Sequence, residues 1–242
     1  VRQTGNPRMA WDAYRRLVSS YGEVVAGLPA SLFEAEITRV TQGQDERLLD
    51  FSQLRQLTRS FLALYETHAG RPFPQDAQEQ LSGAIAAVFA SWNADKAAEY
   101  RRINQIDADM GTAVILQRMV FGNTGGHSGA GVGFTRDPST GEPRLWVDFL
   151  ANAQGEDVVS GRRNAHGHAT LAAVAPEAWK QLQASAQALE QHFQDMEDFE
   201  FTVQDGVLHM LQTRSGKRTP LAAARIALDL LDEGLIDSAE AL

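Results

Sequence analysis

The sequence contains no cysteine among its 242 residues. That absence excludes disulfides and thiolate zinc sites and fits a reducing compartment, so we expect a cytoplasmic location. Basic residues form no long run and the net charge is −9, which argues against nucleic-acid binding. No apolar run approaches the ~20 residues that span a bilayer, so we expect no membrane association.

The first residues, Val-Arg-Gln-Thr-Gly, contain neither an initiator methionine nor the pattern of a signal peptide. We therefore expect the chain to be a piece of a longer protein. Its length is sufficient for one large domain or two small ones, each with a real core.

Helical periodicity dominates the region from residue 7 to about 104. Four stripes of apolar residues recur at spacings of three and four, and they predict four helices packed as a small bundle. The stripes are centred on Leu17, Ile37, Phe61 and Ile85. No residue pattern in this half indicates chemistry.

From about residue 106 the pattern changes to strands and turns mixed with helices, which predicts an α+β fold. We expect strands over Thr112–Phe121, Val132–Arg136 and Arg144–Leu150, a helix over Glu177–Phe193, a hairpin of Glu197–Val203 and Val207–Thr213, and a helix over Thr219–Leu231.

A glycine-rich loop, Gly122 to Gly131, lies between the first two expected strands. Glycine allows the backbone to approach a ligand closely, and several amides of such a loop can point at one anion. The loop therefore indicates a phosphate-bearing ligand. Its candidate contacts are Gly125, Ser128, Gly129 and Gly131.

The expected hairpin has acids on one face, because Asp198 and Glu200 alternate with apolar residues. A two-residue Asp205-Gly206 turn would put Glu200 opposite Leu211 and leave Gln212 on the other face. A three-residue loop that includes Gln204 would set Glu200 opposite Met210 and Asp198 opposite Gln212. We predict the three-residue loop.

Only that second register gathers Asp198, Glu200 and Gln212, with Arg214 beside them. Two carboxylates and an amide are hard oxygen ligands, which suit a Mg²⁺ ion that also holds nucleotide phosphates. The alternative is an exposed sheet face with ordinary charges, since any half-buried strand alternates in this way.

Other motifs are weaker. Neither the P-loop pattern nor the dinucleotide fingerprint is present. His166 and His168 lie two residues apart, but no third metal ligand is evident, so a polar loop is the favoured interpretation. His127, inside the glycine loop, could face either solvent or a ligand.

Taken together, these segments resemble the nucleotide-binding domain of pyruvate phosphate dikinase. The resemblance extends nearly end to end. It is carried by Tyr100-Arg101-Arg102-Ile103-Asn104, by Gly111 to Gly131, by Asn152-Ala153-Gln154-Gly155-Glu156-Asp157-Val158-Val159, and by Glu200-Phe201-Thr202 with Leu211 through Thr219.

The resemblance implies a helical subdomain over 1–105 and, over 106–242, an ATP-grasp subdomain with a mostly antiparallel sheet and flanking helices. It implies ATP as substrate with Mg²⁺ as cofactor, and it assigns residues to three roles. Asp198, Glu200 and Gln212 would hold the metal and the triphosphate; Arg214, Glu156 and Asp157 would serve the phosphate chemistry; Gln117, Met119 and Val120 would flank the adenine.

The resemblance also implies partners. A dikinase of this family transfers phosphate from ATP to a carrier histidine on a swivelling domain, uses inorganic phosphate, and interconverts pyruvate and phosphoenolpyruvate at a barrel. We expect those domains, and a homodimer, in the longer protein, with this chain alone inactive.

The glycine loop departs from the family pattern, which has an acidic residue near Gly126 and threonines near His127 and Ala130. This departure favours an alternative, a degenerate or regulatory nucleotide-binding module. A second alternative is the ATP-binding part of a related dikinase of the phosphoenolpyruvate synthase type, which uses another acceptor.

Overall fold

A computed structural model describes residues 5–44, 46–159 and 167–241. The chain forms two compact units, Val1–Gln117 and Arg118–Leu242. Each unit has a hydrophobic core of its own. The predicted functional boundary after residue 105 stays a prediction.

The first unit is helical, as its periodicity predicts, although its described part has five α-helices where the stripes predict four. Its elements are α1 (Pro7–Val24), α2 (Ala30–Thr41), α3 (Phe51–Ala69), α4 (Ala77–Ser91) and α5 (Asp95–Ile103), with short 3-10 turns at Glu46–Leu48 and Ala108–Met110.

Local signals fix the start of α1 and both ends of α3. The side chain of Asn6 accepts a hydrogen bond from the Met9 amide and so caps α1. Asp50 and Gln53 form a reciprocal capping box at the start of α3, and Gly70 ends that helix with a positive φ of 68°. Each end follows from residues adjacent in the sequence.

Helices α1, α2 and α3 enclose the core of the first unit. Its buried members are Val18, Tyr21, Phe33, Leu49, Leu54, Leu57, Phe61, Tyr65 and Phe73. By contrast, α4 and α5 bury no residue completely within the described part of the chain. The predicted bundle is therefore densest in its first three helices.

The second unit is built around a four-stranded antiparallel sheet in the order β2-β1-β3-β4. Its elements are β1 (Gly129–Phe134), β2 (Trp146–Ala151), α6 (Gly155–Val159), α7 (Gly167–Val174), α8 (Pro176–Phe193), β3 (Glu197–Gln204), β4 (Val207–Ser215) and α9 (Pro220–Asp232). The α+β class is confirmed.

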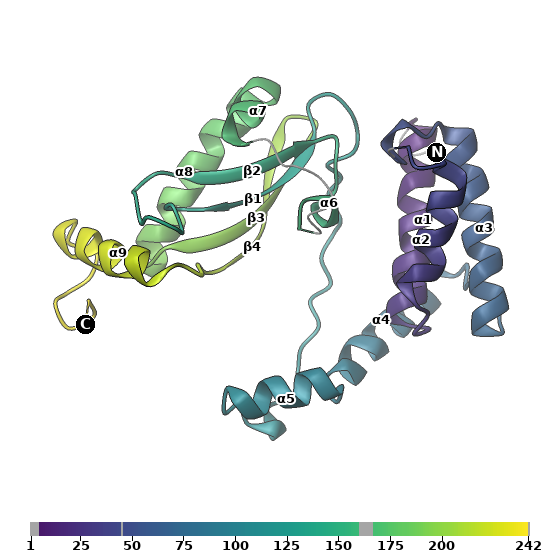
Figure 1. Cartoon of the computed structure of the whole chain (residues 1–242), viewed down its shortest axis with the longest axis horizontal. Coiled ribbons are helices and arrows are strands. Elements are labelled where there is room, and N and C mark those ends of the chain that lie inside the picture. Colours follow the sequence, from purple (N-terminus) through teal and green to yellow (C-terminus); the bar gives the residue numbers. More distant parts are fainter. Residues whose placement is uncertain (1–4, 45, 160–166, 242) are drawn as a thin grey trace. The chain divides into compact units, whose positions relative to one another are not determined.

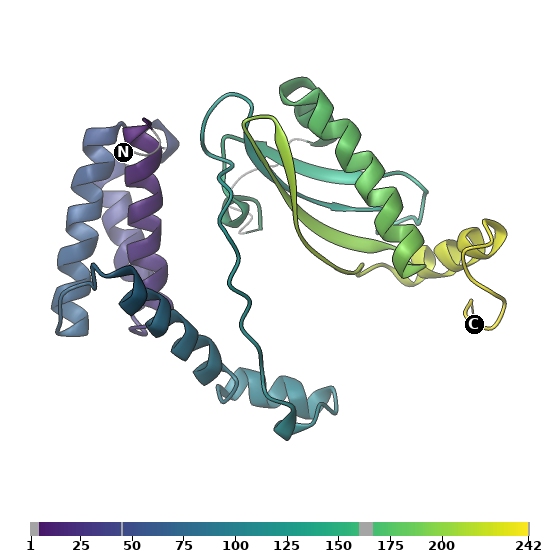
Figure 2. The ribbon, with the colours of Figure 1, turned by 180° about the vertical axis from the view of Figure 1, so that it is seen from behind.

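Helices α7 and α8 cover one face of this sheet, and Figures 1 and 2 show α8 running across the strands. The core between them joins Leu171 and Leu182 of the helices to Phe149, Phe199 and Phe201 of the strands, all fully buried. The rings of Phe149 and Phe201 are stacked, with their planes 7° apart.

The central strand β1 has no side chains on this face, because Gly129, Gly131 and Gly133 point toward the helices. A Cβ atom at Gly133 would lie 2.6 Å from the ring of Phe199, and one at Gly131 would clash with the ring of Phe201. These glycines let phenylalanines from the neighbouring strands spread over β1.

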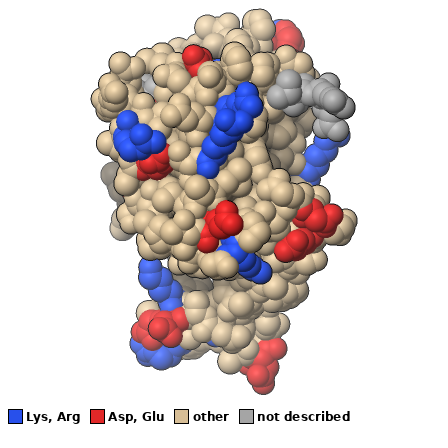
Figure 3. Space-filling model, turned by 90° about the vertical axis from the view of Figure 1, so that its right-hand side faces the viewer, with Lys and Arg blue, Asp and Glu red and all other residues tan. Residues whose placement is uncertain are grey.

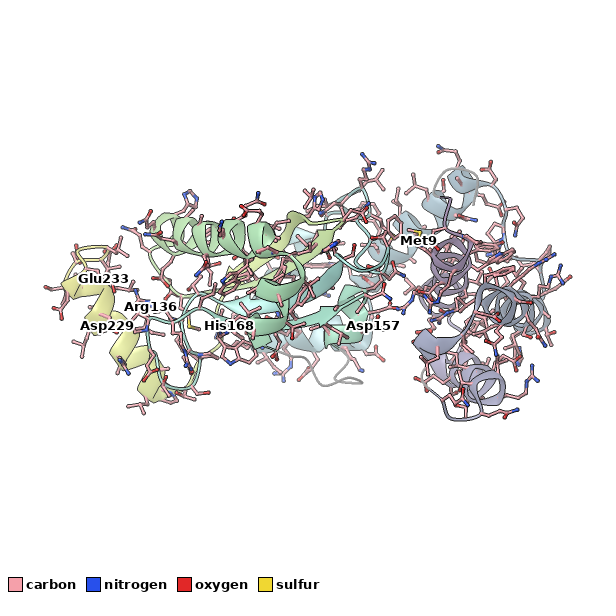
Figure 4. The ribbon with its side chains drawn as sticks, turned by 90° about the horizontal axis from the view of Figure 1, so that it is seen from above. Met9, Arg136, Asp157, His168, Asp229 and Glu233 are labelled. Atoms are coloured by element: carbon pink, nitrogen blue, oxygen red, sulfur yellow. The ribbon has the colours of Figure 1, made fainter. Side chains whose placement is uncertain are left out.

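Helix α9 is attached to the end of the sheet by Arg136, which follows β1 and is 2% exposed. The Nη2 atom of Arg136 donates to Glu190 of α8 at 2.7 Å and to Glu233, directly after α9, at 2.8 Å. Figure 4 shows Arg136 beside Asp229 and Glu233, far from Asp157 at the other end of the sheet. The guanidinium therefore joins three segments.

The predicted strand over Thr112–Phe121 is wrong. This segment contains no strand and pairs with none of the described strands. Its large apolar side chains Ile115, Leu116 and Met119 are 87%, 73% and 65% exposed. A strand needs a partner to satisfy its amides, and this extended segment instead joins the two units.

On the face of the molecule drawn in Figure 3, basic and acidic side chains are interspersed and separated by uncharged surface. Among the described residues, no helix combines the length and the apolar character needed to cross a membrane. The expectation that nucleic acid does not bind stays a prediction.

Candidate functional site

The β3–β4 hairpin turns through two residues, Asp205 and Gly206, because Gln204 pairs directly with Val207. Both turn residues have positive φ angles, 53° and 84°, as in a type I′ turn. The predicted three-residue loop is therefore wrong. The sequence Asp-Gly is itself a strong signal for the shorter turn.

A β-bulge nevertheless brings the polar residues together. Phe201 pairs with Met210, but the residue before it in β3, Glu200, pairs with Gln212. Leu211 is the extra residue of the bulge. The expectation that Asp198, Glu200 and Gln212 share a face is thus confirmed, although the bulge and not the turn produces it.

Asp198 and Glu200 alternate with Phe199 and Phe201, which pack against α8, so the two acids are on the face of the sheet that points away from α8. An ion pair lies next to the Glu200–Gln212 pair. Asp198 is paired with Arg214 across the strands, and the Arg214 Nε donates to Asp198 Oδ2 at 2.8 Å. Asp198 is only 8% exposed, whereas the Arg214 side chain is 59% exposed. One partner is fixed in the sheet and the other extends into solvent.

The electrostatics link these residues. The hydrogen bond to Asp198, together with the charges of Asp198 and Glu200, raises the pKa of the Arg214 guanidinium. Among the described residues, no three His, Cys, Asp or Glu side chains form a group able to hold a metal ion. A metal here would need ligands beyond these acids.

The glycine loop lies at the other end of the sheet from the Asp198–Arg214 pair. Gly129 pairs with Val203, which is three residues, or about 10 Å at ~3.3 Å per residue, from Glu200. The structure thus brings both sequence-predicted sites onto one sheet and separates them along it.

Within the loop, the candidate contacts have different environments. Gly125 has a φ of 133°, which is available to glycine alone. Ser128 is completely buried. Gly129 and Gly131 belong to β1, where the packing of phenylalanine rings accounts for them. Their proposed contact with nucleotide stays a prediction.

The segment after β2 is hydrogen-bonded to the start of the glycine loop. Gln154 Oε1 accepts from the Gly122 amide at 3.3 Å, and its Nε2 donates to Asn123 Oδ1 at 3.2 Å. The backbone amide of Gln154 donates to Asp157 Oδ2 at 3.0 Å. Asp157 is 7% exposed, so it stabilises this segment from inside, while Glu156 is exposed on α6.

Sequence reasoning missed Gln154, Thr124 and Asp205, all of which contact the loop through side chains. For Gln154 a signal existed, since it belongs to the Gln-Gly-Glu-Asp string. For Thr124 and Asp205 the signal was absent, because 81 positions separate the two residues in the sequence.

The residues expected to flank adenine lie in the extended segment before the loop. Gln117 and Met119 are exposed, and Val120 is half-buried. The Phe121 amide, next along the chain, donates to Gln204 Oε1 at 2.8 Å and anchors the segment to the hairpin. The adenine assignment stays a prediction.

Of the singled-out histidines, His166 lies outside the described residues. His168 begins α7 and stacks on Trp179, with ring centroids 5.3 Å apart. The Nδ1 atom of His127 is 2.8 Å from the Val174 carbonyl oxygen. Both described histidines therefore have structural contacts.

Comparison with known proteins adds a family. The model of the family "Pyruvate phosphate dikinase, AMP/ATP-binding domain" matches residues 38–169. The chain is 47% identical to pyruvate, phosphate dikinase of Clostridium symbiosum, over 100% of this chain and 28% of the relative. It is 46% identical to that of Rhizobium meliloti (strain 1021), over 98% and 28%.

The plant protein named pyruvate, phosphate dikinase, chloroplastic, from Flaveria trinervia is 47% identical over 97% of this chain and 25% of the relative. The chain thus spans about a quarter of the length of these curated relatives. The family match covers more than half of the chain and includes both the glycine loop and the segment that follows β2. The chain therefore belongs to the pyruvate phosphate dikinase AMP/ATP-binding domain family.

Proposed function

We propose that this chain binds ATP with Mg²⁺ on the sheet face that carries Glu200, as part of a phosphotransferase that passes phosphate from ATP to a carrier histidine. The carrier histidine and a pyruvate/phosphoenolpyruvate site would lie on other domains of a longer, homodimeric protein. The observation that carries the proposal is the pairing of Glu200 with Gln212 beside the Asp198–Arg214 ion pair.

The residues present fit Mg²⁺ in one specific way. Mg²⁺ keeps several waters and is usually bound by one or two carboxylates together with substrate phosphates. Asp198, Glu200 and Gln212 supply that number and type of oxygen, and the nucleotide would complete the set. When bound, the ion would neutralise phosphate charge during transfer.

Arg214 would contribute a mobile cation. Its guanidinium is exposed yet hydrogen-bonded to the fixed Asp198 carboxylate, so it can reach a phosphate while it stays oriented. A planar guanidinium suits phosphate oxygens because it can donate two parallel hydrogen bonds. Glu156, exposed on α6, and Asp157, buried next to it, are the other proposed participants in the phosphate chemistry.

The glycine loop would hold a further part of the phosphate chain. Within the described part of the molecule, the amides of Gly125, Gly126 and His127 donate no hydrogen bond. Successive unpaired amides in a glycine-rich turn form a favourable anion site. The adenine would lie along Gln117, Met119 and Val120.

The second acceptor and the compartment are also part of the proposal. The relatives' names, pyruvate, phosphate dikinase, favour inorganic phosphate over the water used by the synthase-type alternative. Plant relatives are named chloroplastic, so the cytoplasmic location inferred from the missing cysteines applies to a bacterial setting.

The test uses a full-length dikinase that contains this chain. Glu200→Ala and Gln212→Ala should each abolish labelling of the carrier histidine by ATP that is radioactive in its γ- or β-phosphate. Phosphoenolpyruvate–pyruvate exchange, which does not need the nucleotide site, should stay at the wild-type rate. Wild-type labelling in either variant would refute the proposed site. Lys180 of α8 forms an exposed ion pair with Glu177 and offers a control, since Lys180→Met should change neither reaction.

A further inference from the structure

The buried hydroxyl of Ser128 is fully engaged inside the protein. Ser128 is 0% exposed. Its Oγ atom lies 2.5 Å from Thr124 Oγ1 and accepts a hydrogen bond from the Asp205 amide at 2.9 Å. A phosphate could reach this hydroxyl only by displacing both partners, so its position requires another explanation.

The partner on the far side is the tip of the β3–β4 hairpin. Asp205 Oδ1 accepts from Thr124 Oγ1 at 2.9 Å, which leaves Ser128 Oγ to donate to Thr124 Oγ1. The adjacent Gly206 amide donates to the His127 carbonyl oxygen at 2.9 Å. Side-chain and backbone hydrogen bonds therefore join Thr124, His127 and Ser128 of the glycine loop to one turn.

The turn residue suits this task. Asp205 has a positive φ of 53°, a conformation that Asp and Asn tolerate better than other non-glycine residues. Its main chain makes the turn while its side chain reaches the loop. Replacement by alanine would remove the acceptor and disfavour the turn, whereas asparagine would keep both features.

The hydrogen bonds of the loop divide it into a base that is held by the hairpin and a tip whose amides are unpaired within the described part of the chain. The base residues Thr124 and Ser128 bond to the hairpin, and the Ser128 amide closes the loop on the Gly125 carbonyl at 3.0 Å. Between them, the amides of Gly125, Gly126 and His127 make no hydrogen bond among the described residues. Fixing the base therefore fixes where the unpaired amides point.

We propose that Thr124, Ser128 and Asp205 form a latch that holds the glycine loop in the shape that receives the nucleotide's phosphates. Asp205 is a positioning residue, and Ser128 belongs to the latch and not to the phosphate contacts. This inference rests on the proposed function of the loop. It explains why a carboxylate lies next to an anion site, since the Thr124 hydroxyl donates to it there.

The test compares matched variants in a full-length dikinase that contains this chain. Thr124→Val removes the hydroxyl at nearly constant shape, and Thr124→Ser keeps it; Asp205→Ala removes the acceptor, and Asp205→Asn keeps it. We expect Val and Ala to raise the KM for ATP about tenfold, the equivalent of one hydrogen bond to a charged group. Ser and Asn should stay within about twofold of wild type.

A second readout separates positioning from general damage. Phosphoenolpyruvate–pyruvate exchange should be unchanged in all four variants. Hydrogen exchange of the amides of residues 122–129 should accelerate in Thr124→Val and not in Thr124→Ser. The latch is refuted if Thr124→Val has the wild-type KM for ATP, or if Asp205→Asn is as impaired as Asp205→Ala, because the charge itself would then act.

The outcome also distinguishes the latch from the function on which it rests. If Glu200→Ala abolishes histidine labelling while Thr124→Val binds ATP normally, the latch fails and the proposed function stands. If Glu200→Ala labels the histidine normally, the proposed function fails whatever the latch variants show.

Discussion

Glu200 and Gln212 lie directly opposite each other in the β3–β4 hairpin, although a regular ladder from the Asp205-Gly206 turn would pair Glu200 with Leu211. The bulge at Leu211 changes which face Gln212 occupies. Met210, Leu211, Gln212 and Thr213 line a groove beside α8, so the bulge lies next to that helix.

This relationship makes a swap informative. Gln212→Leu should abolish ATP-dependent histidine labelling in a full-length dikinase, because the amide is lost from the Glu200 face. Exchanging the two residues, with Leu211→Gln and Gln212→Leu together, should not restore labelling, because position 211 does not face Glu200. Recovery in the double variant would mean that the ladder is regular in solution. Labelling of the carrier histidine is the measurement.

The second prediction concerns β1. Gly133→Ala should destabilise the second unit by about 1–3 kcal/mol, since a Cβ must displace the Phe199 ring and the Trp146 carbonyl in a filled core. Urea unfolding followed by tryptophan fluorescence measures this, with Trp11 and Trp92 replaced by phenylalanine so that Trp146 and Trp179 report. Gly126→Ala is the control, because no atom lies within 4 Å of its added Cβ. Equal midpoints for the two variants would contradict the packing argument.

The third prediction concerns Arg136. Arg136→Met should cost about 3 kcal/mol, the lower end of the range for breaking a buried pair, because Glu190 is left nearly buried while Glu233 is half exposed. Arg144→Met breaks an ion pair whose arginine is 68% exposed and should cost less than about 1 kcal/mol. Thermal unfolding of both variants decides, and a smaller loss for Arg136→Met than for Arg144→Met would show that the cluster does not anchor α9.

The fourth prediction concerns pH. Burial opposes ionisation of Asp195, but hydrogen bonds from the Arg218 guanidinium and the Met196 amide outweigh it and hold the pKa of Asp195 below its ordinary value. A carboxylate with a lowered pKa in the folded state stabilises fully above the ordinary Asp value of about 3.9. That stabilisation is lost as the pH falls through the folded pKa.

Asp195→Asn should therefore lose stability relative to wild type at pH 6, and the difference should shrink toward pH 3. Urea midpoints at both pH values measure the effect. A difference between the two proteins that is constant with pH would exclude Asp195 as the titrating group. Arg218 bonds both carboxylate oxygens, at 2.5 and 2.6 Å, so Arg218→Met should flatten the pH dependence in the same way.

Features that depend on neighbours in the sequence could be predicted from the sequence alone. The periodic stripes predicted α1 to α4 of the first unit but not α5. The alternation of Asp198 and Glu200 with phenylalanines predicted a strand, and the motif strings predicted the family. Each of these signals is local, because helical period, strand alternation and capping are set by residues a few positions apart.

The tertiary structure decided what depends on distant residues. The bulge at Leu211, and not the turn, places Gln212 beside Glu200. Gly129 makes room for Phe149 of β2, and Gly131 and Gly133 make room for the phenylalanines of β3. Thr112–Phe121 forms no strand because it finds no partner. The polar residues of the site could be identified from the sequence. Their shared face and the Thr124–Asp205 contact depend on the packing of remote segments, because the energy of a cross-strand pair depends on both residues and on their register.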